Sequence, residues 1–183
     1  MSSDPAHPAR LLLAMHRGDE EAARALWEAH AGRLTALARA ITGSHADALD
    51  AVQEAFVSVL SLSAARAATI DDDGCYLAVA VRTRALNLLR SDASRATRER
   101  ESAPLRLVGK PSDDPALEEA LKSLPLESRD IVALKHLAGL TFDQIAVALG
   151  VPRATAASRY YNTIEQLRSA MGAPQPNREV ARA

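Results

Sequence analysis

The stretch LESRDIVALKHLAGLTFDQIAVALGVPRATAASRYYNTIEQLRSAM, residues 126–171, decides the fold of the second half of the chain. Apolar residues recur at helical spacing up to Gly139, which supplies a natural stop. Thr141 and Gln144 then have the form of a capping box, so a second, short helix is expected to follow and to end at Gly150. The pattern predicts two short helices separated by a glycine turn.

Pro152 suits the first turn of a third helix, which is expected to run to about Met171. Two helices joined by a short turn containing glycine are typical of a helix-turn-helix, whose last helix is presented to DNA. Arginine, asparagine and serine can read base edges or grip phosphates. The residues expected to point outward are Arg153, Ser158, Arg159, Tyr161, Asn162 and Arg168. A three-helix bundle with a solvated outer face has the same pattern and stays an alternative.

Charge is unevenly distributed along the 183 residues, although the formal net charge is only −1. Residues 82–110 carry eight basic against three acidic side chains, and residues 152–183 carry five against two. Local potential, rather than total charge, decides where a polyanion binds. The near-neutral average therefore does not argue against nucleic acid as a partner.

Several function classes lack their sequence signals. Cys75 is the single cysteine, and the five histidines show no metal-ligand spacing, so we assign no metal and no cofactor. Phosphate-cradling glycine loops and nucleophile elbows are also missing, which argues against an enzyme. The chain has no secretion signal and no run of about 18 apolar residues, so we expect a soluble, cytoplasmic protein without membrane insertion.

The first half also shows helical periodicity. A short helix is expected over residues 9–17, and a long one with a buried stripe then ends at Gly43. The next helix starts at Ser44, and its expected buried stripe is Leu49, Val52, Phe56, Val59 and Leu60. Residues 61–73 are read as a loop whose aspartates cap a further helix with a basic edge.

These patterns predict an all-α fold of two small helical domains joined by a flexible linker. Three prolines and a glycine between Ser102 and Pro115 prevent a continuous helix there. The predicted organisation is a disordered tail over 1–8, a first domain over 9–100, the linker over 101–114, a second domain over 115–171 and a disordered tail over 172–183.

Two motifs resemble the extracytoplasmic-function (ECF) sigma factors of bacterial RNA polymerase. The run DALDAVQEAF, residues 47–56, is similar to region two of that family. The second half resembles region four in order and spacing, through Leu124-Pro125, Gly139-Leu140-Thr141-Phe142, Ile145-Ala146, Leu149-Gly150, Thr155, Ser158 and Arg159. The resemblance covers about residues 10 to 171. It implies a promoter-specificity subunit without catalysis of its own, whose partners are core RNA polymerase, promoter DNA and an anti-sigma factor that no residue here identifies.

The resemblance also implies roles for individual residues. Asp50, Gln53 and Glu54 would dock on the clamp helices of the largest polymerase subunit. The loop 61–73 and the helix after it would open and read the minus-ten element, and the DNA-binding residues implied there are Tyr76, Arg82, Arg84 and Arg90. In the recognition helix the implied DNA-binding residues are Arg153, Thr155, Ser158, Arg159, Tyr161 and Asn162.

This chain departs from the family pattern in both regions. The loop contains no aromatic residue, and Tyr76 stands where members usually have tryptophan. The recognition helix has Ala157 and Asn162 where members usually have basic residues, and three arginines contacting phosphate would give a logarithmic salt slope of only about −2.7. Two alternatives therefore stay open, a helix-turn-helix regulator that does not act with polymerase and a protein-binding helical adaptor.

Overall fold

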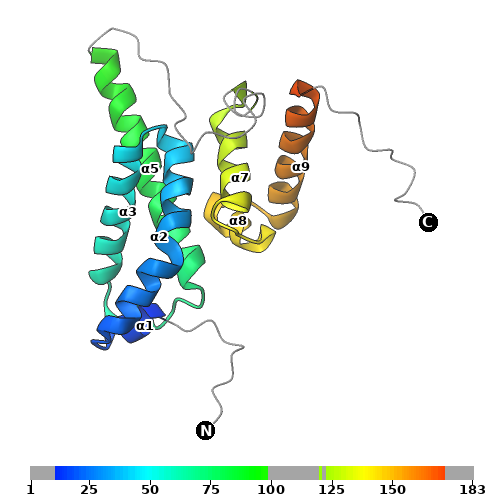
Figure 1. Ribbon diagram of the computed structural model, residues 1–183. Coiled ribbons are helices and arrows are strands. Elements are labelled where there is room, and N and C mark those ends of the chain that lie inside the picture. Colours follow the sequence, from blue (N-terminus) through cyan, green and yellow to red (C-terminus); the bar gives the residue numbers. More distant parts are fainter. Residues whose placement is uncertain (1–10, 99–119, 121–122, 172–183) are drawn as a thin grey trace, which may run out of the picture.

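The computed structural model describes the backbone of residues 11–98, 120 and 123–171, and the side chains of these residues except 92–98. Every regular element in these ranges is a helix, which confirms the all-α prediction (Figure 1). The helices are α1 Leu11–His16, α2 Glu20–Thr42, α3 His45–Leu60, α4 Ala64–Ala67, α5 Asp73–Arg98, α7 Leu126–His136, α8 Phe142–Leu149 and α9 Arg153–Ala170. The predicted linker 101–114 and both predicted tails lie outside the described residues.

Local capping sets the ends of the first long helices. The Asp19 side chain accepts a hydrogen bond from the Ala22 amide at 3.0 Å and begins α2. Gly43 ends α2 in the left-handed region, with φ of 74°. Ser44 then caps α3 by accepting from the Asp47 amide at 3.3 Å. The predicted stop and start between α2 and α3 are both confirmed.

The buried face of α3 differs from the predicted stripe. Leu49 and Leu60 were expected inside, but they are 38% and 59% exposed, so that part of the prediction is wrong. The face packed on α2 and α5 consists of the residues Ala48, Ala51, Val52, Ala55 and Val59. Small alanines let the helices approach closely, which displaces the larger leucines to the rim.

The segment 61–73 is not entirely a loop. It contains the short helix α4, whose first turn is capped by Ser63 accepting from the Arg66 amide at 3.2 Å. Asp72 caps α5 as expected, since it accepts from the Cys75 amide at 2.7 Å. Asp73 has another role, because its buried carboxylate accepts from the Leu12 amide at 3.1 Å and ties α1 to the start of α5.

The predicted helix-turn-helix is confirmed in α8 and α9. Thr141 and Gln144 form a complete capping box at the start of α8, and Gly150 ends that helix with φ of 65°. Gly139, with φ of 74°, turns the chain between α7 and α8. Only glycine adopts this backbone conformation without strain. The three helices pack against one another through α7–α9 and α8–α9 contacts.

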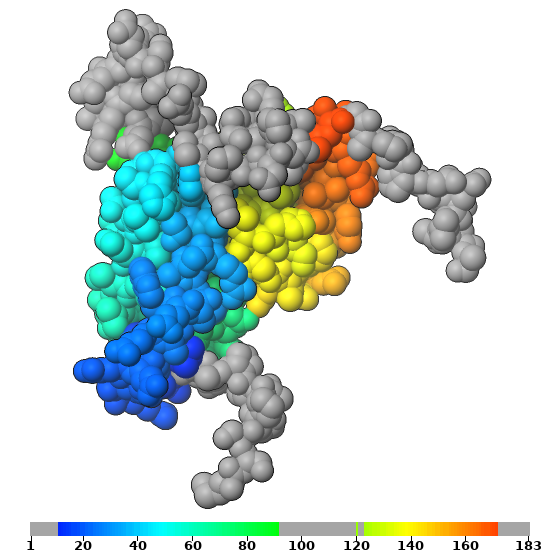
Figure 2. Space-filling model, viewed as in Figure 1, coloured from blue at the N-terminus to red at the C-terminus, as the bar shows by residue number. Residues whose placement is uncertain are grey.

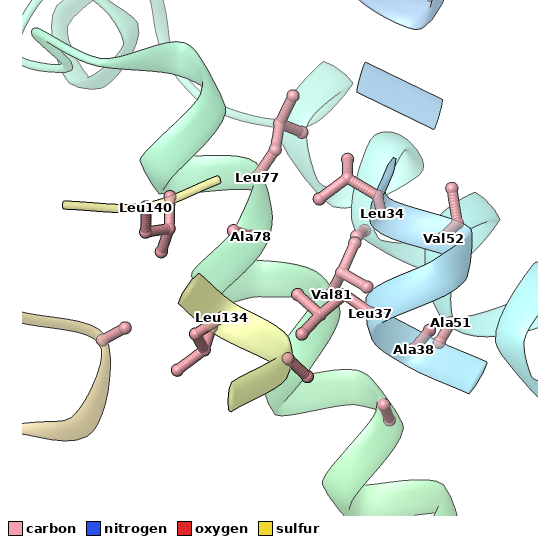
Figure 3. Close-up of a cluster of buried hydrophobic side chains, with 14 of the residues drawn as sticks. Leu34, Leu37, Ala38, Ala51, Val52, Leu77, Ala78, Val81, Leu134 and Leu140 are labelled. Carbon is pink, nitrogen blue, oxygen red and sulfur yellow. The ribbon is translucent and has the colours of Figure 1, made fainter. Parts of the chain in front are cut away.

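The two helical parts share one apolar core. Helix α7 packs against α2, and α8 contacts α5. Leu134 and Leu140 lie beside Ala78 and Val81 of α5 in one buried cluster (Figure 3). In the space-filling view the surface of α2 runs directly into that of α7 and α8 (Figure 2). The second part is therefore docked on the first through buried contacts.

We expect Thr141→Ala to lower the free energy of unfolding by about 1 kcal/mol, because it leaves the Gln144 amide without its cap. Urea denaturation followed by circular dichroism measures the change. Ser169→Ala, at an exposed position in the last turn of α9, is the control and should stay within about 0.5 kcal/mol of the parent. Equal denaturation midpoints for both variants would contradict the role given to the cap.

Candidate nucleic-acid and protein interfaces

Helix α3 presents Asp50, Gln53 and Glu54 on its exposed face, as the sequence pattern predicted. The three side chains line one open hollow together with Val57 of α3 and Arg84 of α5. Arg84 Nη1 lies 3.7 Å from Glu54 Oε2 across this hollow. The structure therefore brings a predicted protein-binding residue next to a predicted DNA-binding one. We call Asp50, Gln53, Glu54 and Val57 the α3 face.

Sequence reasoning missed the apolar part of this surface. Val57 is 61% exposed and Leu60 is 59% exposed at the same end of α3. Val57 follows Asp50 and Glu54 along one helical row, at spacings of seven and three residues. This spacing can be read from the sequence, and it is the signal that could have identified Val57 as part of this surface. A row that combines carboxylates with an exposed aliphatic side chain suits a partner helix carrying both basic and apolar residues.

The residues predicted to contact DNA along α5 are not all equally accessible. Arg84 and Arg90 are exposed, and Arg90 Nη1 donates to Asn87 Oδ1 at 3.3 Å. Tyr76 is half-buried against the core, so its ring is only partly available for stacking on a base. The four residues predicted for the minus-ten side thus lie on one helix, but the structure does not bring them to one equally accessible surface.

Arg82 is engaged by the second helical part. Its Nη2 and Nε lie 2.6 and 2.7 Å from Asp130 Oδ2 of α7, and its Nη1 donates to the Ala148 carbonyl of α8 at 3.3 Å. The Asp130 side chain is only 4% exposed and that of Arg82 is 20% exposed. Burial raises the pKa of Asp130 above its ordinary value, although the hydrogen bond and charge of Arg82 oppose this effect. The sequence offered no signal for this pairing of distant residues.

Helix α9 carries the predicted recognition surface. Most of the predicted DNA-binding side chains are exposed there, namely Arg153, Ser158, Arg159, Tyr161 and Asn162. Thr155 is half-buried, and its carbonyl accepts from Ser158 Oγ at 3.1 Å. Arg153 Nε lies 3.2 Å from Asp143 of α8, but both side chains are exposed, so this ion pair is weak. The exposed side chains of this face are accessible for polar contacts with a ligand such as DNA.

An aromatic cluster that sequence reasoning did not identify supports this helix. The rings of Tyr160 and Tyr161 lie 5.3 Å apart, and the ring of Phe142 lies 5.4 Å from Tyr160. Tyr160 Oη also lies 2.9 Å from His136 Nε2 of α7. Tyr161 is 62% exposed at the edge of the cluster. Its ring is held in place beside the recognition face, where it can contact a sugar or a base.

Within residues 11–98 and 123–171, none of the helices has the length and apolar character needed to cross a bilayer.

Comparisons with known proteins identify both helical parts. Residues 26–95 match the family model described as "Sigma-70 region 2", and residues 115–167 match "Sigma-70, region 4". The chain is 30% identical over 167 residues to the ECF RNA polymerase sigma factor SigE of Mycolicibacterium smegmatis, an alignment that covers 81% of this chain and 63% of that protein. The chain thus spans less than two thirds of this relative's length.

These matches agree with the arrangement of helices. The region 2 match extends from within α2 to within α5, and the region 4 match includes α7, α8 and most of α9. Domains of this family are not catalytic, in agreement with the prediction that the chain is not an enzyme. The chain therefore carries region 2 and region 4 of the sigma-70 family in that order, and it is similar to a sigma factor of the extracytoplasmic-function type.

Proposed function

We propose that this chain binds core RNA polymerase in the cytoplasm and directs it to a small set of promoters for transcription initiation. The observation that carries the proposal is the presence of two separate exposed faces on matched family domains. One is the α3 face in region 2, and the other is the outer face of α9 in region 4. A single-site DNA-binding regulator needs only the second of these faces.

The α3 face is the proposed polymerase-docking surface. Asp50 and Glu54 supply negative charge, Gln53 supplies hydrogen-bonding groups, and exposed Val57 supplies an apolar contact. Charge complementarity with a basic helical partner increases the association rate and sets the register of docking. Trp27 of α2 and Phe56 of α3, whose rings lie 4.8 Å apart, pack the two helices against each other. The face is thereby held on a rigid element, which reduces the entropy lost on binding.

Promoter DNA is the proposed ligand of α5 and α9. The residues proposed for the minus-ten side are Tyr76, Arg82, Arg84 and Arg90, and those proposed for the other element are Arg153, Thr155, Ser158, Arg159, Tyr161 and Asn162. Each surface offers few cations, so each binds weakly alone. Two weak modules held on one polymerase gain from effective concentration, so their joint affinity exceeds that of either one.

We expect the double substitution Gln53→Ala with Glu54→Ala to reduce binding to core polymerase at least about tenfold, because it removes a carboxylate and an amide from the docking surface. Co-purification and fluorescence anisotropy with core polymerase measure the effect. Glu28→Ala, which removes one exposed carboxylate from α2, is the matched control. If the double variant bound polymerase as tightly as the control, the docking surface would lie elsewhere on the chain.

We expect Arg159→Ala to reduce promoter-directed transcription while binding to core polymerase stays unchanged. Loss of one phosphate contact would lower the logarithmic salt slope of DNA binding by about 0.9, whereas loss of a base contact would cost about 1–3 kcal/mol in discrimination. Run-off transcription on promoters selected from a genomic fragment library measures the loss of promoter-directed transcription. Titration of DNA binding with salt measures the change in the logarithmic salt slope.

Arg24→Ala removes an exposed arginine from α2 and serves as the control for charge. Equal promoter affinity in Arg159→Ala and Arg24→Ala would exclude Arg159 from the DNA contact. Polymerase binding without transcripts from the parent protein would instead point to impaired promoter melting.

A further inference from the structure

Helix α1 bridges the two ends of the segment between α3 and α5. Its Leu12 amide donates to Asp73 Oδ2 at 3.1 Å, and Asp73 is the first residue of α5. Near the other end of α1, His16 Nε2 lies 2.9 Å from the carbonyl oxygen of Val59, in the last turn of α3. In Figure 1, α1 lies at the end of the region 2 bundle where α3 ends and α5 begins. One short helix therefore holds both residues that flank the segment 61–73.

The Asp73 carboxylate is the buried anchor of this contact. The residue is only 9% exposed, and within the described part of the chain its Oδ1 has no hydrogen-bond partner. Burial of a carboxylate is unfavourable unless the group is paired, so the bond from the Leu12 amide and the position in the first turn of α5 offset that cost. The Leu12 amide lies in the first turn of α1, where amides have no partner within the helix. The starts of α1 and α5 therefore stabilise each other.

Apolar side chains hold the middle of the same segment. Leu12 is completely buried in the core cluster that also contains Ala67 of α4 and Ile70, which follows α4. Helix α1 also contacts α4 directly. A shift of the segment 61–73 would break these contacts and expose apolar surface. The segment is thus fixed at both ends and along its buried side by α1.

The outer side of α4 carries a group suited to nucleic acid. Arg66 and Thr69 are exposed, and Arg66 Nη1 donates to Thr69 Oγ1 at 3.5 Å. Thr69 Oγ1 in turn donates to the Arg66 carbonyl at 2.8 Å. Arg66 is the only basic residue between positions 61 and 73. Because a guanidinium can bind a phosphate or stack on a base, the side of the segment that faces solvent is equipped to contact a DNA strand.

We propose that α1 is a brace that presets the segment 61–73 for contact with the unwound promoter strand, with Asp73 and His16 as its positioning residues. This proposal rests on the proposed function, in which region 2 acts on the minus-ten element. A segment already fixed in its bound conformation loses less conformational entropy when it captures DNA. More of the binding energy is then available to open the duplex. The brace therefore favours promoter opening and leaves polymerase docking on the α3 face unaffected.

Hydrogen exchange followed by mass spectrometry tests the brace in the full chain. His16→Ala removes the contact with the Val59 carbonyl, and Asp73→Ala removes the acceptor of the Leu12 amide. Local opening of the segment becomes easier when its anchors are lost, so we expect the amides of residues 61–70 to exchange at least about fivefold faster in both variants. Peptides from α7 to α9 should exchange as in the parent.

Two further variants are the controls for this measurement. Asp73→Asn keeps a side-chain oxygen that can accept from the Leu12 amide, so exchange should stay close to that of the parent. His45→Ala removes an exposed histidine from the start of α3 and should leave exchange unchanged. Parent-like exchange in both His16→Ala and Asp73→Ala would contradict the brace, as would equally fast exchange in His45→Ala.

Transcription from two templates tests the effect on promoter opening. One template is a duplex promoter, and the other has the same sequence with the minus-ten element held open by mismatched bases. We expect Asp73→Ala and His16→Ala to lose at least about tenfold in run-off transcription on the duplex and less than about threefold on the mismatched template, with polymerase binding unchanged. Asp73→Asn should behave as the parent on both templates. An equal loss on both templates, or no loss on the duplex, would overturn the proposal.

The brace and the proposed function fail in different ways. Lack of binding to core polymerase by the parent would refute the proposed function, while hydrogen exchange would still decide whether α1 fixes the segment 61–73. Polymerase binding and transcription by the parent, combined with parent-like exchange in both alanine variants, would support the proposed function and refute the brace.

Discussion

The arrangement of the two helical parts depends on one buried ion pair, Arg82 with Asp130. Its partners lie on α5 and α7, and the same guanidinium reaches the end of α8 through the Ala148 carbonyl. Buried pairs tolerate little misplacement, because a charge that loses its partner inside a protein costs several kcal/mol. The apolar contacts around Leu134 and Leu140 supply attraction without direction, whereas the ion pair selects one docking geometry.

Helix α3 combines a buried packing face with the proposed polymerase-docking surface. Its inner face is rich in alanine, so α2 and α5 approach closely and bury it completely. Packing therefore does not constrain the residue types in its outer row, which carries Asp50, Glu54 and the exposed Val57. The packing face and the proposed docking surface thus lie on opposite faces of one helix. This separation allows the outer face to change its specificity at little cost to the fold.

The α3 face and the basic edge of α5 are adjacent and electrostatically linked. Arg84 lies 3.7 Å from Glu54, and both side chains are about half exposed. An exposed pair of this kind contributes at most about 1 kcal/mol, so it does not prevent either side chain from engaging a partner. Because the two side chains lie close together, a partner bound to Glu54 would change the electrostatic potential at Arg84. The proposed polymerase-docking and DNA-contact surfaces of region 2 are therefore not independent.

The sequence alone determined the features that depend on neighbouring residues. Helix ends at Gly43, Ser44, Thr141 and Gly150 follow from caps within a few positions, and the exposed face of α9 follows from helical spacing. The order of the two family motifs was also readable, and the matches to regions 2 and 4 confirmed it. Only the tertiary structure decided that Leu60 is exposed and that Asp73 holds α1. It alone paired Arg82 with Asp130, 48 positions away, because such a contact depends on how helices pack and no local pattern records it.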